Sequence, residues 1–368
     1  MKILHVLPIS GYLITKHYIR FIKENFGLEK NSFAVIGRPR DNSENAIPMN
    51  NADIKYFDSY IKNYFKIMSY FLKFDKVLFH SLSIRTIEKI FFLLNPLIMK
   101  RLVWIAWGND LYHWKKNRTN MPCKVANIIE LFFRKKINNF VGIFPPDVDY
   151  FKKTFNSNAQ TFYASYVGGL YNPIYTKDLD LTSLEEKKNH NSCINIQIGH
   201  SSTQVLNHIE VLEDLYKFRD ENIRIYIPLS YGDEEYGDQV EKKAKLLFGD
   251  KAVCFREMMS NEDYMKFLST IGIAIFNTFR QIGLGNIHPL LYMEKKIFMP
   301  AGSVMYDYYR SLGINICDYK QIKQLDFRSF TEPIDMTKAK QFVKSNATNK
   351  QKKIEMWSKV FNAPLKWG

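Results

Sequence analysis

The strongest constraint on the fold is an alternation of short apolar runs with amphipathic stretches that stops once and then starts again. Short apolar runs are typical of buried strands, and the stretches between them have helical periodicity. Strands that alternate with helices form parallel sheets, so the pattern predicts an α/β protein. The predicted strands of the first half are Ile3–Leu7, Phe33–Ile36, Lys76–His80, Leu102–Trp107, Phe140–Phe144 and Thr161–Ala164.

The alternation is interrupted after Gly168 by glycines, a proline and the polar run EEKKNHN, a composition typical of a linker. We therefore expect two Rossmann-like domains with parallel sheets and a C-terminal helix, the layout of the GT-B glycosyltransferase fold. The predicted strands of the second half are Ile194–Gly199, Ile223–Pro228, Ala252–Phe255, Ile273–Asn277 and Ile297–Met299. The expected divisions are a first domain at 1–167, a linker at 168–192, a second domain at 193–336 and a helical segment at 337–368.

The net charge of the chain indicates which classes of partner it can bind. Lys and Arg total 52 against 37 Asp and Glu, and the net charge of +15 attracts anions. Nucleic acid, anionic lipid headgroups and pyrophosphate-bearing small molecules all fit this charge.

The four cysteines lie far apart without a CxxC pair, so the sequence has no zinc or redox motif. We therefore expect the cysteines to be reduced thiols of a cytoplasmic protein. The most apolar stretch, Ile90–Met99, is too short to span a membrane, and the N-terminus is interpreted as a strand instead of a signal peptide.

The first candidate ligand motif is Ile198–His208, IGHSSTQVLNH, where a strand ends at a glycine and small polar residues lead into a helix. Ligands of open α/β sheets bind beyond the carboxyl ends of strands, and helix-start N–H groups bind phosphate. An ordinary turn with a Ser/Thr helix cap is the alternative. The candidate residues are Gly199, His200, Ser201, Ser202, Thr203 and His208.

The second candidate motif is Phe276–Ile287, FNTFRQIGLGNI, in which a glycine-rich loop leads into a helix. Backbone donors and the helix dipole make such a loop an anion site, and an arginine adds a fork of donors for pyrophosphate. It is not the GxGxxG dinucleotide motif, and glycines that merely allow a tight turn are the alternative. The candidate residues are Asn277, Arg280, Gln281, Gly283, Gly285 and Asn286.

The third motif, Trp104–Trp114, gathers three of the five tryptophans at the end of a predicted strand. Aromatic rings beside carboxylate and amide groups are typical of sugar-binding sites, and an aspartate or histidine there is a candidate general base. The alternative is a structural aromatic corner in which Asp110 caps a helix. The candidate bases are Asp110 and His113, and the candidate sugar or acceptor contacts are Trp107, Asn109 and Tyr112.

Three further segments carry weaker signals. Tyr231, in the PLSYG segment at 228–232, is a candidate wall for the donor base, and Glu257 is a candidate partner of a ribose or sugar hydroxyl. A plain loop suits the PLSYG segment equally well, and an exposed surface glutamate is the favoured interpretation of Glu257. The sequence Asp147-Val148-Asp149 has the form of a metal-binding DxD motif, but PPDVD is more typical of a helix start. No metal cofactor is expected.

Taken together, these segments resemble the family of 4-acetamido-4,6-dideoxy-galactose (Fuc4NAc) transferases of enterobacterial common antigen synthesis, glycosyltransferase family 56. The matching pieces keep the family's order and spacing, although this chain has His200-Ser201 where the family has Asn-Ser. They are WGNDLY at 107–112, the loop from Gly199 to His208, PLSYG at 228–232, REMMSNEDY at 256–264 and FRQIGLGNI at 279–287.

The resemblance implies transfer of an amino-deoxy sugar from a dTDP-sugar to a polyprenyl-pyrophosphate-linked glycan. The second domain would hold the donor and the first the acceptor, with domain closure excluding water. The resemblance also implies a peripheral enzyme at the cytoplasmic face of the bacterial inner membrane. The basic, aromatic segment Tyr60–Lys76 fits contact with an anionic membrane surface, and an ordinary domain helix is its alternative.

Two other functions fit the sequence less well. A nucleotide-dependent oxidoreductase or epimerase is disfavoured because the first strand lacks GxGxxG. Nucleic acid is not an expected partner, because the chain has no compact basic motif. A transferase of the same fold with another nucleotide sugar, for O-antigen or capsule, stays open.

Overall fold

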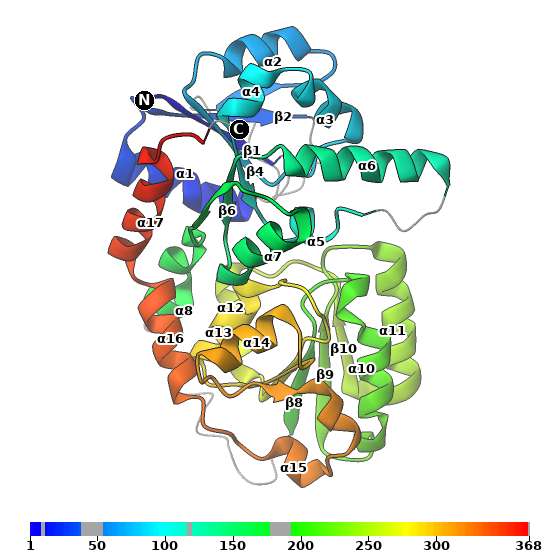
Figure 1. Cartoon of the computed structure of the whole chain (residues 1–368). Coiled ribbons are helices and arrows are strands. Elements are labelled where there is room, and N and C mark those ends of the chain that lie inside the picture. The colour runs from blue at the N-terminus through cyan, green and yellow to red at the C-terminus, as the bar shows by residue number, and fades with distance from the viewer. Residues whose placement is uncertain (9–11, 38–53, 116–119, 177–192, 367–368) are drawn as a thin grey trace. The chain divides into compact units, whose positions relative to one another are not determined.

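The chain folds into two compact units (Figure 1). Met1–Gly168 and Lys350–Gly368 form the first unit, and Gly169–Asn349 form the second. The structure is a computed structural model, and it describes residues 1–8, 12–37, 54–115, 120–176 and 193–366. Residues 177–192 of the predicted linker lie outside the described residues.

The first unit is built on a seven-stranded sheet with the order β3-β2-β1-β4-β5-β6-β7, and its strand pairs are parallel. Its central strands are buried along their whole length, as expected for apolar runs covered by helices on both faces. The strands are β1 Ile3–Leu7, β2 Asn31–Ile36, β3 Ile54–Phe57, β4 Lys76–His80, β5 Leu102–Ala106, β6 Asn139–Gly142 and β7 Gln160–Tyr163. The helices are α1 Tyr12–Phe26, α2 Tyr64–Phe71, α3 Thr86–Leu93, α4 Pro96–Arg101, α5 Asn109–Tyr112, α6 Met121–Lys135, α7 Pro145–Phe155 and α17 Lys350–Asn362.

The second unit holds a six-stranded sheet with the order β10-β9-β8-β11-β12-β13, again with parallel pairs. The strands are β8 Ile194–Ile198, β9 Ile223–Pro228, β10 Ala252–Phe255, β11 Ile273–Ile275, β12 Lys296–Met299 and β13 Cys317–Asp318. The helices are α8 Pro173–Thr176, α10 His208–Leu215, α11 Glu234–Phe248, α12 Asn261–Thr270, α13 Leu284–Tyr292, α14 Val304–Ser311, α15 Phe327–Thr331 and α16 Thr337–Ala347.

The C-terminal segment differs from the predicted single helix. α16 belongs to the second unit, and α17 belongs to the first. The indole of Trp357 donates to the carbonyl of Ser165 at 3.2 Å, and the buried Lys76 ammonium donates to the carbonyl of Val360 at 2.9 Å. The chain therefore completes the first unit with its own C-terminal end.

The helix that follows the Gly199 loop begins only at His208, because a 3-10 turn at Gln204–Leu206 and a left-handed Asn207 precede it. All four cysteines lie in the described ranges and are free. No helix in those ranges has both the length and the apolar character of a membrane span.

Candidate functional site

Two loops at the centre of the second sheet contain the predicted ligand residues. β9 and β10 lie on one side of β8, whereas β11, β12 and β13 lie on the other. Where the strand order reverses in this way, an open parallel sheet has a crevice at the carboxyl ends of its strands, and ligands bind there. One loop follows β8 and starts at Gly199, and the other follows β11 and ends at Gly283. Both predicted motifs therefore lie at the reversal point.

The first loop requires a glycine at its start. Gly199 has a φ of +61°, and its N–H donates to the carbonyl of Ile275 at 2.9 Å. A Cβ atom on Gly199 would lie 2.5 Å from Nε2 of His208. His208 is fully buried, and its Nδ1 lies 3.3 Å from the Tyr236 hydroxyl. The structure thus places His208 against the loop backbone, where it supports the loop.

The first loop is also attached to the PLSYG loop after β9. The N–H and the hydroxyl of Ser202 both donate to the Tyr231 carbonyl at 2.8 Å. The hydroxyls of Ser201 and Thr203 lie 2.8 Å apart. Tyr231 itself is 48% exposed. The predicted Tyr231 therefore lies at the same end of the sheet as the Gly199 loop.

The two predicted loops touch each other. Gly283, the residue before α13, has a φ of +71°. A Cβ atom there would lie 2.9 Å from both Nδ1 and Cε1 of His200. The carbonyl of Gly283 accepts from the N–H of Asn286 at 2.8 Å, which starts the helix. His200 and Gly283 therefore join the motifs into one site.

This contact is buried and carries a positive charge. Burial, and then the charge of Arg280, lower the pKa of His200 to about 4, so its ring is neutral at pH 7. The buried guanidinium of Arg280 supplies the cation. Among the described residues, Nδ1 of His200 and Oε1 of Gln281 are buried without a hydrogen-bond partner. Buried polar atoms of this kind are costly unless a water or ligand completes their bonding.

The side chains of two asparagines of the second motif form hydrogen bonds with other residues of the second unit. Nδ2 of Asn277 donates to Glu210 Oε2 at 2.9 Å, and Asn286 Oδ1 accepts from the Tyr264 hydroxyl. Tyr264 was missed as a site residue, although the REMMSNEDY segment contains it. A Cβ atom on Gly285 would meet no atom within 4 Å, so the space beside the first turn of α13 is open.

Glu257 and one cavity of the second unit lie outside the two predicted motifs. Glu257 is exposed after β10, and its neighbour Arg256 forms ion pairs of 2.7 Å with Asp238 and Glu241. A cavity of about 450 Å³ contains no predicted site residue. Its lining is Tyr306, Arg310, Asn315, Ile316, Cys317, Asp318, Gln321, Ile334 and Asp335.

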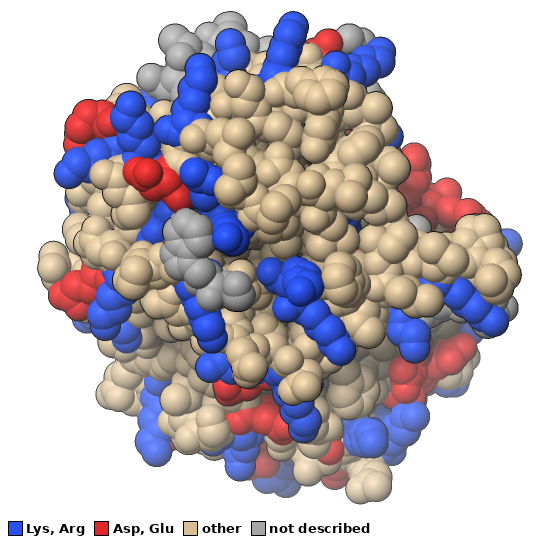
Figure 2. All heavy atoms as spheres, turned by 45° about the horizontal axis from the view of Figure 1, so that its top comes forward, with Lys and Arg blue, Asp and Glu red and all other residues tan. Residues whose placement is uncertain are grey.

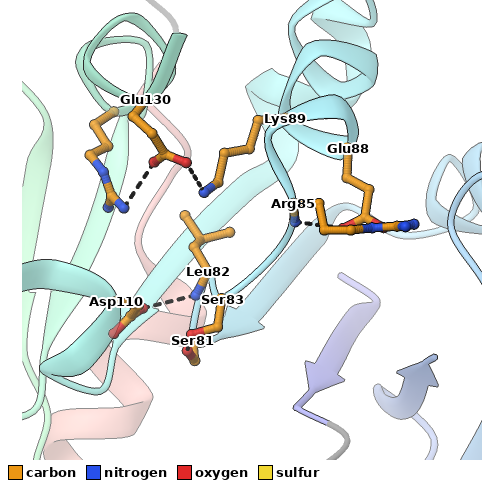
Figure 3. Close-up of polar contacts among 9 residues, drawn as sticks. Ser81, Leu82, Ser83, Arg85, Glu88, Lys89, Asp110 and Glu130 are labelled. Carbon is orange, nitrogen blue, oxygen red and sulfur yellow. Dashed lines mark hydrogen bonds and ion pairs between the residues drawn. The ribbon is translucent and has the colours of Figure 1, made fainter. Parts of the chain in front are cut away.

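In the first unit, Asp110 is buried and fixes two loops (Figure 3). Its Oδ2 accepts from the Leu82 N–H at 2.8 Å and from the Trp104 indole at 2.6 Å, and its Oδ1 accepts from the Trp107 N–H at 2.8 Å. Three N–H donors occupy most of the acceptor sites of this carboxylate. This geometry matches the structural-corner alternative for Asp110 better than a general base.

His113 has the opposite surroundings. It is exposed just after α5, and its Nδ1 lies 2.9 Å from the side-chain oxygen of Asn109. Since that oxygen accepts, Nδ1 donates, and Nε2 carries the lone pair of the neutral ring. The half-buried Trp107 packs edge-on against Tyr166. Of the two candidate bases, His113 is the accessible one.

The DxD segment forms a helix start. Asp147 lies in the first turn of α7 and accepts from the Phe144 N–H at 3.1 Å and from the Tyr112 hydroxyl at 2.8 Å. Asp147 is fully buried, and burial raises its pKa to about 7. The predicted acceptor contact Tyr112 is therefore tied to α7.

A cavity of about 510 Å³ lies at the carboxyl ends of β2, β3 and β4, and sequence reasoning missed it. Ser81, which follows β4, has a φ of +72°, and its hydroxyl lies 2.9 Å from that of Ser83 (Figure 3). Arg85 donates from two nitrogens to Glu88, at 2.8 and 2.6 Å. The cavity is lined by Ile36, Gly37, Asp58, Ser59, Tyr60, Lys62, Ser83, Ile84, Arg85 and Glu88.

Comparison with known families gives one match. The model of the family described as "4-alpha-L-fucosyltransferase glycosyl transferase group 56" matches residues 76–299. The match includes both loops of the second unit and the Trp104–Trp114 segment of the first.

Solved structures show the same fold at low sequence identity. The Anabaena protein HepE in complex with UDP and glucose has a TM-score of 0.67 and 10% identity, over 99% of this chain and 100% of that one. A glycosyltransferase from Rickettsia africae has a TM-score of 0.64 and 15% identity, over 99% of each chain. Sucrose-phosphate synthase from Thermosynechococcus elongatus has a TM-score of 0.62 and 9% identity, over 98% of this chain and 96% of that one. The predicted GT-B fold is confirmed.

Proposed function

The chain belongs to glycosyl transferase group 56, the family described as 4-alpha-L-fucosyltransferases, and from this premise we propose its reaction. Family and fold make the chain a glycosyltransferase. In the proposal it moves an amino-deoxy sugar of the Fuc4NAc type from a dTDP-sugar to a polyprenyl-pyrophosphate-linked oligosaccharide. The donor diphosphate binds where the Gly199 and Gly283 loops meet.

The contact between His200 and Gly283 is the observation that carries this proposal. It brings two groups of backbone donors and the Arg280 guanidinium to the strand-order reversal, which suits a diphosphate. The buried Nδ1 of His200 and Oε1 of Gln281 are further groups that a bound donor would complete. The open space beside Gly285 leaves room for the ligand at the first turn of α13.

The chemistry assigns a role to each group. The bond between the sugar's anomeric carbon and the diphosphate breaks, and the diphosphate keeps the electron pair. Arg280 and the loop N–H groups stabilise the charge that develops there. The acceptor hydroxyl forms the new bond, and Nε2 of His113 takes its proton, because Asn109 fixes the ring through Nδ1.

The polyprenyl acceptor places the reaction at a membrane surface, which we propose is the cytoplasmic face of the inner membrane. Common antigen is the favoured product, with O-antigen and capsule as alternatives. A UDP-sugar is the second candidate donor, because the similar structure of HepE was solved with UDP and glucose.

A donor panel tests the proposal. The full chain is mixed with dTDP, UDP and GDP, and binding is measured by thermal shift and calorimetry. We expect dTDP to bind best, and dTDP-Fuc4NAc to support transfer to a polyprenyl-pyrophosphate-linked acceptor. Binding restricted to UDP or GDP would overturn the dTDP assignment, and absence of all nucleotide binding would overturn the donor site.

Arg280→Ala is the informative variant in this panel. Loss of a charge-assisted hydrogen bond to phosphate weakens binding by about tenfold to a hundredfold. Arg328→Ala, which removes an exposed arginine on α15, is the matched control and should bind as the wild type does. Equal affinities of all three proteins would contradict the role of Arg280.

A further inference from the structure

Helix α6 of the first unit has charged residues inside and apolar residues outside. Glu130 and Arg134 are buried, although ordinary surface helices turn such residues to water. The exposed apolar residues are spaced by four, three and four positions, which places them on one face of the helix. They are Met121, Val125, Ile128 and Phe132.

The buried charges of α6 are paired within the unit. Glu130 contacts the Lys89 ammonium of α3 (Figure 3) and lies 3.1 Å from Nη2 of Arg134. The guanidinium of Arg134 lies over the Trp104 ring, 4.8 Å from its centroid. These contacts fix the orientation of α6, so its apolar stripe is held outward.

The neighbouring helices extend this stripe into a larger surface. α3 joins α6 through the Lys89–Glu130 pair, and α2 packs on α3 through the rings of Tyr64 and Phe91, 4.9 Å apart. Three more exposed apolar residues lie here: Phe65 on α2, 84% exposed, Leu94 after α3, 72% exposed, and Leu97 on α4. We call these three and the α6 stripe the apolar face.

The exposed charges on the helices of the apolar face are positive. Glu88 and Glu130 are the acidic residues of α2, α3, α4 and α6, and both are buried in ion pairs. Figure 2, in which the top of Figure 1 comes forward, shows a broad tan area with Lys and Arg along much of its margin and Asp or Glu at its right edge. The exposed lysines on or beside α2 and α6 are Lys62, Lys66, Lys73, Lys124, Lys135 and Lys136.

We propose that the apolar face docks on an anionic lipid bilayer. The α6 stripe would enter the boundary between headgroups and acyl chains, and the flanking lysines would meet lipid phosphates. An apolar area bordered by cations, on helices whose own carboxylates are buried, complements such a surface. The inference rests on the proposed function, because a polyprenyl-linked acceptor lies in the bilayer and docking there would let the enzyme reach it. It extends the basic Tyr60–Lys76 segment to a surface of four helices.

Vesicle binding tests the inference without any substrate. The full chain is floated with phosphatidylcholine vesicles that contain or lack phosphatidylglycerol. The double variant Ile128→Ser/Phe132→Ser should bind anionic vesicles about tenfold more weakly than the wild type, because less apolar area is buried. Leu246→Ser removes an equally exposed apolar residue from α11 of the second unit and should change nothing. The variant Lys124→Glu/Lys135→Glu should lose the preference for anionic lipid.

Thermal unfolding of each variant checks that it is folded. Wild-type binding by the folded double variant would overturn the inference, and so would failure of the wild type to bind anionic vesicles. A wild-type dimer that this double variant dissociates, without vesicle binding, would assign the face to a second copy and also overturn it. Because no nucleotide is present, failure here is distinct from failure of the donor panel.

Discussion

Gly199 occupies a position where backbone conformation and surroundings both require glycine. Its φ is +61°, and a Cβ atom would meet His208 at 2.5 Å. We expect Gly199→Ala to lower the free energy of unfolding by about 1–3 kcal/mol and to weaken dTDP binding. Urea unfolding and calorimetry measure the two effects. Gly285→Ala is the control: open space surrounds that position within α13 and alanine favours a helix, so the free energy of unfolding should not fall. Equal stability of both variants would contradict the account of the loop.

The two candidate bases, Asp110 and His113, can be distinguished by how their substitution changes the free energy of unfolding. His113 is exposed, so His113→Ala should leave the free energy of unfolding unchanged and lower kcat by about 100-fold or more. Asp110 accepts three N–H donors, so Asp110→Asn should destabilise the first unit by about 1–3 kcal/mol. Urea unfolding and steady-state rates measure both. An unstable His113 variant with normal turnover would reverse the assignment.

The sequence predicted which residues lie at the ends of strands, but it did not predict which other residues they contact. Arg280 and Gly283 could be predicted because glycine-rich loops before helices have a recognisable spacing. The support given by His208 to Gly199, and the three donors of Asp110, depend on how each loop folds back on itself and, for Leu82, on a contact with a distant segment. Periodicity carries no information about such contacts.

At the scale of elements, the ion pairs between α3 and α6 offer a sharp test. Glu130 neutralises the buried Lys89 and Arg134. Glu130→Ala leaves two cations buried and should lower the free energy of unfolding by about 3–5 kcal/mol. Replacing all three residues by Met or Leu should cost much less, because no unpaired charge remains. Denaturant midpoints measure both, and a mild effect of the single variant would show that water reaches the pair.

Most strands were predicted correctly because buried parallel strands are continuous apolar runs. β3 and β13 were missed, since they are short and half of their residues are polar or charged. The predicted helical segment at 337–368 contains two helices, α16 and α17, because the chain leaves one unit and enters the other near Asn349. Amphipathic periodicity identifies a buried helix face but not the sheet that covers it.

For the whole molecule, we expect the free energy of unfolding to decrease as the pH is lowered below 6.5. Burial lowers the pKa of His5 and His200 to about 4 and that of His208 to about 3. The unfolded chain therefore binds more protons than the folded one below pH 6.5, and the stabilisation present above pH 6.5 is lost as pH falls through the folded pKa values. His5 and His200 each contribute at most about 3 kcal/mol, and His208 at most about 5 kcal/mol.

Asp147 acts in the opposite direction. Its pKa is raised to about 7, so the folded state holds its proton longer and this group reduces stability as pH rises from 4 to 7. The effect of the three histidines on stability exceeds that of the one aspartate. The urea concentration at the unfolding midpoint should therefore decrease as the pH is lowered from 6.5 to 4.5. Asp147→Asn should make the fall steeper. A midpoint that is flat across this range would contradict the buried, neutral histidines.

The central claim is that the two loops of the second unit jointly hold the donor diphosphate. A crystal structure of the chain with dTDP tests it most directly. We predict that the diphosphate lies between Gly199–Thr203 and Arg280–Asn286, with the Arg280 guanidinium within hydrogen-bonding distance of a phosphate oxygen. A nucleotide bound elsewhere, or a diphosphate that neither loop touches, would contradict the account.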